Sequence, residues 1–157
     1  MGFKRLSVIV IGLLMSFNVF AQEIRTIPKV LIHVDAKYDK IFMELNQEFI
    51  DCGISVLPLR NINYIVVVPY LPNVWAIVTP DRTGILIDDN IPEYLPLFKK
   101  FVLLHEIGHF YDGIGHTEDG PMVRRAGTTI TVEDVIRNYY KYEKEYLNYL
   151  YNKQNVE

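Results

Sequence analysis

Apolar residues in this chain fall into short runs typical of strands and longer periodic segments typical of helices. The short runs are rich in β-branched residues and lie at residues 30–34, 64–68, 74–78 and 85–87. Residues 64–68 (YIVVV) are apolar throughout, so we expect an interior strand there, with another at 74–78. Residues 80–84 (PDRTG) are a turn cluster before the last strand.

The first helical segment follows the first strand. Phe42, Leu45, Phe49 and Ile50 recur at helical spacing, and Gly53 supplies the stop. The whole order of strands and helices predicts an α+β (mixed α/β) domain. We expect a small twisted sheet of about four strands, an early helix, a central helix and a C-terminal helix.

The central and C-terminal helices are expected in the second half of the chain. The central helix begins between Asn90 and Pro96, because proline is tolerated only in the first turn of a helix. Residues 97–111 are apolar almost all round, which predicts a helix buried at the centre of the domain. The C-terminal helix begins at Thr131, whose hydroxyl can cap it while Asp134 returns the bond.

The first 21 residues (1–21) are expected to be a secretory signal peptide. Lys4 and Arg5 precede an apolar stretch at residues 6–20, and Ala21 is a suitable cleavage position. The stretch is short, and it is interrupted by polar residues, whereas a membrane anchor needs roughly 20 apolar residues. We therefore expect an exported, secreted or periplasmic domain at residues 22–157 that is not stably inserted in a membrane.

The composition of the mature chain narrows its function. Removing 21 of 157 residues leaves 136, which suits one domain, and we expect a monomer. Losing Lys4 and Arg5 reduces 16 basic side chains to 14 against 19 acidic ones, which argues against nucleic acid as a partner.

The lone Cys52 excludes an internal disulfide and is expected to be buried. Ser55 is the one serine left, so a serine nucleophile is not expected.

The histidines carry the candidate chemistry. Three of the four lie within twelve residues, and two belong to the sequence His105-Glu106-Ile107-Gly108-His109. Residues four apart on a helix share a face, so the imidazoles of His105 and His109 can bind one zinc ion. Glu106 points about 100° away from His105 and flanks that ion. In this HExxH arrangement zinc activates a water, and the glutamate takes its proton and returns it to the leaving amine. We expect one zinc ion per chain.

A catalytic zinc site also needs a third protein ligand and one open position. Asp112-Gly113 can end the helix and reverse the chain, which brings His116 toward the metal. Here residues 105–122 resemble the metzincin peptidases, and most of all the matrixin-type members, whose motif is HExxHxxGxxH followed by a methionine turn. This chain has one extra residue before Gly113. The resemblance implies a zincin-like fold, His116 as the third ligand and Met122 as the turn methionine.

Three carboxylates are alternatives for the third ligand. Asp112 lies on the same helical face as His105 but about 10 Å along the axis, which suits a supporting role. Glu133 and Asp134 begin the last helix, as in zincins whose third ligand is a distant glutamate. Both also have an ordinary role there, because carboxylates are favourable at a helix N-terminus.

The sequence therefore predicts a secreted zinc metallopeptidase, a metalloendopeptidase acting on peptide or protein substrates with Glu106 as general base. The resemblance implies that the strand before the central helix, Ile85-Leu86-Ile87, is the edge strand that pairs with extended substrate. One alternative is a non-catalytic zincin-like metal-binding or regulatory protein. A cytosolic zincin-like regulatory protease is a third hypothesis, which requires that residues 1–21 are retained.

Overall fold

A computed structural model describes residues 33–113, 115–116, 120–124 and 130–156. The expected signal peptide and residues 30–32 of the first expected strand lie outside this part of the chain. The elements are β1 (His33–Val34), α2 (Ala36–Asp51), η1 (Leu57–Asn61), β2 (Tyr64–Val68), β3 (Ala76–Val78), β4 (Gly84–Asp88), α3 (Pro96–Asp112), η2 (Met122–Arg124) and α4 (Val132–Gln154). Within the described residues the domain is mixed α and β, with three α-helices and a four-stranded sheet, as predicted.

The strands form one mixed sheet in the order β1-β2-β4-β3. β2 lies inside the sheet and runs parallel to both β1 and β4, so the expected interior strand at 64–68 is confirmed. Its burial is partial, however, because only Ile65 is fully buried and the other four residues of the strand are half-buried.

The edge strand differs from the one that the metzincin resemblance implied. Ile85–Ile87 belong to β4, which is paired on both sides, so this expectation is wrong. The turn at residues 79–83 folds β3 back along β4 as an antiparallel hairpin, with Val78 opposite Ile85, and this hairpin makes β3 an edge strand of the sheet, as β1 is at the other side. The strand expected at 74–78 is thus shorter than predicted and is not an interior strand.

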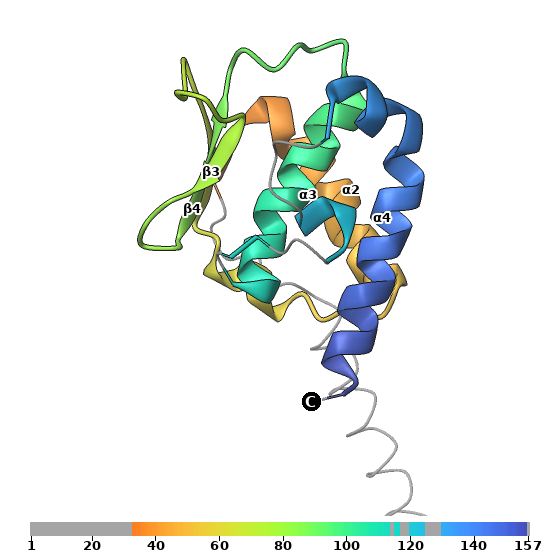
Figure 1. Ribbon diagram of the computed structural model, residues 1–157. Coiled ribbons are helices and arrows are strands. Elements are labelled where there is room, and N and C mark those ends of the chain that lie inside the picture. Colours follow the sequence, from red (N-terminus) through yellow and green to blue (C-terminus); the bar gives the residue numbers. More distant parts are fainter. Residues whose placement is uncertain (1–32, 114, 117–119, 125–129, 157) are drawn as a thin grey trace, which may run out of the picture. The chain divides into compact units, whose positions relative to one another are not determined.

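The helix α3 occupies the centre of the domain, as its apolar sequence predicted. Figure 1 shows it between the sheet and α4, and it also packs against α2. Leu103, Leu104 and Ile107 are completely buried along it. Burying a leucine or isoleucine side chain contributes about 1.5–3 kcal/mol, so this contact surface fixes the axis of α3 firmly.

The helix ends follow the local signals. Gly53 ends α2 with a left-handed φ of 69°, and Pro96 is the first residue of α3. Thr131 caps α4 by accepting a hydrogen bond from the backbone N–H of Asp134 at 3.1 Å, whereas the Asp134 carboxylate accepts from Asn138 and Tyr142. No helix among the described residues is long and apolar enough to span a membrane.

Cys52 is exposed, contrary to the expectation of a buried thiol. It follows the last residue of α2 and precedes Gly53, which has a left-handed φ of 69°. Position in a helix end, rather than the apolar character of the thiol, decides its exposure.

A buried ammonium group joins the three helices. Lys100 of α3 lies 2.5 Å from a carboxylate oxygen of Glu48 on α2 and 3.3 Å from one of Glu143 on α4. Burial opposes its charge, but the bonds to these carboxylates outweigh that effect and raise the pKa of Lys100. The Tyr139 hydroxyl also donates to Glu143, so the cation and its partners form one network inside the helical layer.

We expect Lys100→Met to lower the free energy of unfolding by about 3 kcal/mol, because it leaves two part-buried carboxylates without their cation. Urea denaturation of the purified variant measures this change. Lys40→Met is the matched control, since Lys40 pairs with Glu44 at 3.9 Å on the surface and its loss should cost less than about 0.5 kcal/mol. Equal stability losses in the two variants would contradict the structural role of the network.

Candidate metal centre

The helix α3 presents two imidazoles to one space, and the following loop adds a third. The ring centroids of His105 and His109 are 5.1 Å apart, and each lies 5.0–5.2 Å from the ring of His116. One ligand nitrogen from each ring can be chosen so that all lie within 4.8 Å of one another. The three histidines are therefore close enough to hold a metal ion.

The chain returns toward the helix through Gly113. Its φ of 86° is accessible to glycine at little cost, and its N–H donates to the carbonyl of His109 at 3.1 Å. Asp112 is the last residue of α3, so the residue that is extra relative to the metzincin motif falls within the helix. His116 then lies with its Nε2 3.0 Å from that of His105.

Backbone carbonyls orient both helical imidazoles. Nδ1 of His105 contacts the carbonyl of Val123, and Nδ1 of His109 lies 3.1 Å from the carbonyl of Gly113. Nδ1–H donation to these oxygens leaves each Nε2 with a free lone pair, the usual state of a histidine that binds a metal. Two nitrogens at 2.0–2.1 Å from a tetrahedral ion are about 3.3 Å apart, close to the 3.0 Å between His105 and His116. This pair of nitrogens is therefore spaced as two ligands of one metal ion would be.

The imidazoles are held unprotonated. Burial is the main cause that lowers the pKa of His105 to about 3 and that of His109 to about 4; the positive charge of Arg124 contributes to both shifts, and hydrogen bonds to backbone carbonyls oppose them. Burial and then Arg124 also lower the pKa of His116, which is more exposed. At neutral pH all three rings are therefore neutral, the form in which they donate electron pairs to a metal.

Glu106 follows His105 on α3 and is almost completely buried. Burial raises the pKa of its carboxyl group to about 7, although Arg124 and a hydrogen bond from the backbone of Val78 lower it. The contact with Val78 places the carboxyl group beside the edge strand β3. A carboxyl group with a pKa near neutrality can both accept and return a proton, as a general base requires.

None of the alternative carboxylates belongs to the histidine cluster among the described residues. Asp112 instead accepts hydrogen bonds from Tyr146 at 3.0 Å and from Lys153 at 2.9 Å, both on α4. Asp134 accepts from side chains of its own helix, and Glu133 is in the first turn of α4. The three carboxylates therefore have the supporting and helix-terminal roles that the sequence offered as alternatives to binding the metal.

The short helix η2 lies against the ring of His105. Met122 is its first residue and is half-buried, and the carbonyl that His105 contacts belongs to the next residue, Val123. Arg124 completes the element with a side chain only 2% exposed. Sequence reasoning missed Arg124 and the Val123 carbonyl, because no spacing rule links them to the HExxH helix.

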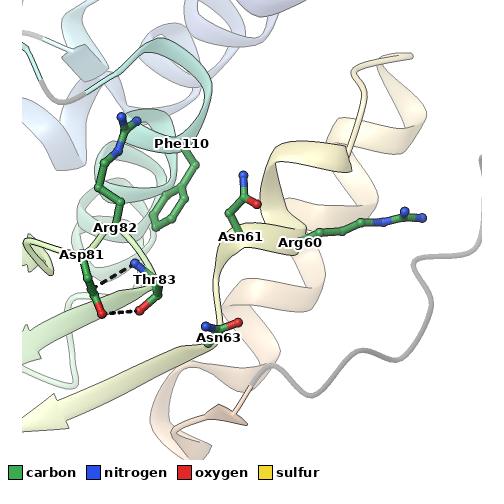
Figure 2. A pocket seen from close by; sticks show the side chains of 7 residues that line it. All are labelled: Arg60, Asn61, Asn63, Asp81, Arg82, Thr83 and Phe110. Atoms are coloured by element: carbon green, nitrogen blue, oxygen red, sulfur yellow. Dashed lines mark hydrogen bonds between the residues drawn. The ribbon is translucent and has the colours of Figure 1, made fainter.

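A polar cavity of about 500 Å³ lies beside the end of α3. Phe110 forms one wall, and the β3–β4 turn and the end of η1 form the others. Arg82 of the turn donates to the carbonyl of His109 at 3.1 Å. Figure 2 shows Arg82 rising beside Phe110, whereas Arg60 extends away from both, so the two guanidinium groups do not converge on one anion.

Comparisons with known proteins give no match, since no family model, curated protein or solved structure matches the chain. The likeness to the metzincins therefore rests on the motif residues 105–122.

Gly108, inside the motif, is required by close packing from α4 and η2. A Cβ atom at this position would lie 2.5 Å from the hydroxyl oxygen of Tyr146 and 2.9 Å from Cδ of Arg124. Both neighbours are almost fully buried, so neither side chain has free space to move into. The absence of a side chain at Gly108 is what allows α4 and Arg124 to approach α3.

We expect Gly108→Ala to lower the free energy of unfolding by about 1–3 kcal/mol, the usual cost of overpacking a core. Chemical denaturation checks the value. Gly115→Ala is the matched control, because a methyl group added there would meet no atom within 4 Å and the backbone needs no left-handed φ. The control should change stability by less than about 0.5 kcal/mol. An alanine tolerated equally at both positions would show that the contact over Gly108 is unimportant.

Proposed function

We propose that this chain is an exported zinc-dependent peptidase in which His105, His109 and His116 hold the metal and Glu106 is the general base. The single observation that supports it most is the convergence of three neutral imidazoles, two of them oriented by backbone carbonyls. Three protein ligands leave one coordination position open, which distinguishes a catalytic zinc site from a closed structural one.

This set of ligands suits zinc better than it suits a hard cation such as magnesium or calcium. Imidazole nitrogens favour zinc and its transition-metal neighbours, whereas magnesium and calcium prefer oxygen. When bound, zinc lowers the pKa of water to about 7 and polarises a carbonyl oxygen. His116 is exposed, so the centre is open to solvent and to a substrate.

Glu106 supplies the proton transfers that hydrolysis needs. Its carboxylate accepts a proton from water as the water oxygen bonds to the carbonyl carbon of the scissile peptide. The carbon–nitrogen bond then breaks, and Glu106 passes the proton to the leaving nitrogen, which departs as a neutral amine. The products are a carboxylic acid and an amine, so water is the only co-reactant. The burial of Glu106 beside its metal-binding neighbour suits this role, since it shields the proton from bulk water.

The edge strand β3 offers a docking surface for an extended peptide. It pairs with β4 on one side, and no described residue pairs with its other side. An edge strand presents free backbone N–H and C=O groups that a peptide can use for antiparallel pairing. In the metzincins the edge strand has this function, and the contact of Glu106 with Val78 brings the general base to the same strand.

The export signal completes the proposal. Residues 1–21 have the charge and apolar pattern of a signal peptide, and cleavage would leave Gln22 as the first residue.

We expect the purified mature protein to bind one zinc ion, and His116→Ala to weaken zinc binding by at least about tenfold, because only two imidazoles remain. Competition with a chromogenic chelator measures the affinity. His33→Ala is the control, since His33 lies in β1 outside the cluster, and it should bind zinc like the wild type. Undiminished zinc affinity in His116→Ala would move the third ligand to Asp112, Glu133 or Asp134.

Hydrolysis of a peptide library tests the enzymatic role. The zinc-loaded wild type should cleave peptides, and Glu106→Gln should lower kcat by about 10²–10⁴-fold, since the amide cannot accept the proton. Zinc stoichiometry should remain one, because the substitution spares the imidazoles. If both proteins bind one zinc ion and neither cleaves any peptide, the protein is a non-catalytic metal-binding or regulatory protein.

A further inference from the structure

Arg124 is the most deeply buried cation among the described residues, and its contacts surround the histidine cluster. One guanidinium nitrogen donates to the carbonyl of His105 at 3.2 Å. The other donates to the carbonyls of Gly113 at 2.8 Å and Gly115 at 3.0 Å. The first of these oxygens belongs to α3. The other two belong to Gly113 and Gly115, which precede His116 in the loop.

The charge of the guanidinium is balanced from the end of α3. Nε of Arg124 lies 3.6 Å from a carboxylate oxygen of Asp112. Asp112 is itself held by Tyr146 and Lys153 of α4, at 3.0 and 2.9 Å. A buried charge persists only where its partners are fixed, so the C-terminal half of α4 secures the position of Arg124.

Arg124 also shares an acceptor with a helical imidazole. The Gly113 carbonyl lies 3.1 Å from Nδ1 of His109 and 2.8 Å from the guanidinium. The guanidinium nitrogen is 3.0 Å from the same Nδ1. Nδ1 cannot donate to Gly113 and accept from Arg124 at once. Donation to the carbonyl is the state that frees Nε2 for a metal, and Arg124 fixes that carbonyl in place.

We infer that Arg124 is a positioning residue of the metal centre. It binds the carbonyls of Gly113 and Gly115 and so holds the ring of His116 at the distance from which it can share an ion with the helical imidazoles. The inference rests on the zinc site of the proposed function but not on hydrolysis. It assigns to a residue outside the HExxH motif the task of bringing in the third ligand.

The guanidinium shape is essential to this task. Arginine presents several N–H donors in a planar fork, whereas lysine offers a compact ammonium on a flexible stem. Arg124→Lys therefore keeps the buried charge beside Asp112 but cannot hold three carbonyls together. Arg124→Ala removes the charge as well and leaves those buried carbonyls without a donor.

Zinc affinity, measured by chelator competition, and the visible spectrum of the cobalt-substituted protein test the inference. We expect Arg124→Lys and Arg124→Ala to weaken zinc binding by about 10–100-fold, as loss of a group that orients ligands does. Circular dichroism verifies that each variant is folded. If Arg124→Ala does not fold, the zinc affinity of Arg124→Lys alone tests the inference. Arg82→Ala is the matched control, because Arg82 is an exposed arginine that also donates to the His109 carbonyl. Its zinc affinity should stay within about threefold of the wild type.

The double variant His116→Ala/Arg124→Lys separates positioning from general destabilisation. If Arg124 acts through His116, the double variant should bind zinc about as weakly as His116→Ala alone. The losses in zinc affinity do not add when one residue acts through the other. Additive losses, or wild-type affinity and cobalt spectrum in Arg124→Lys, would overturn the positioning role and leave the proposed function standing. A wild-type protein that binds no zinc would refute the proposed function together with the inference.

Discussion

The burial of α3 between the sheet and the other helices is the constraint on which the rest of the structure depends. A helix that is enclosed on nearly every side must find a partner for each polar group that it carries. Lys100 finds carboxylates on α2 and α4, and His105 and His109 find backbone carbonyls in the segments that follow. The same enclosure that makes α3 rigid therefore also directs its imidazoles.

Positive charge is concentrated in this interior and is balanced in two places. Lys100 lies between Glu48 and Glu143 near the first half of α3, and Arg124 lies beside Asp112 at its end. Burial, with a smaller contribution from the second cation, keeps the histidines neutral, the form that can bind a metal, but the cation would also repel a metal ion. Asp112, with its bonds from α4, reduces that repulsion and links the histidine cluster to the terminal helix.

The site combines a rigid half with a half that depends on loop contacts. His105, Glu106 and His109 take their positions from a well-packed helix, whereas His116 follows Gly113 and Gly115, whose carbonyls are bound by one guanidinium. In the proposed site, a third ligand from a loop completes what the short helical motif begins, and it makes the site sensitive to residues far from the motif. The close packing over Gly108 has a related cause, since the side chains of Tyr146 and Arg124 both contact α3 at this position.

Local signals in the sequence determined the helices, most strand positions and the shared face of His105 and His109. Periodicity, capping residues and proline act within a few residues of themselves, so they can be read without knowing the fold. Only the tertiary structure decided that β3 is the edge strand, that Cys52 is exposed and that Arg124 lies behind the histidines. The edge position of β3 and the place of Arg124 depend on contacts between segments brought together by folding, such as that of Arg124 with the carbonyl of His105, 19 residues apart in the chain. No spacing rule along the sequence specifies such contacts, because the packing of the whole core selects them.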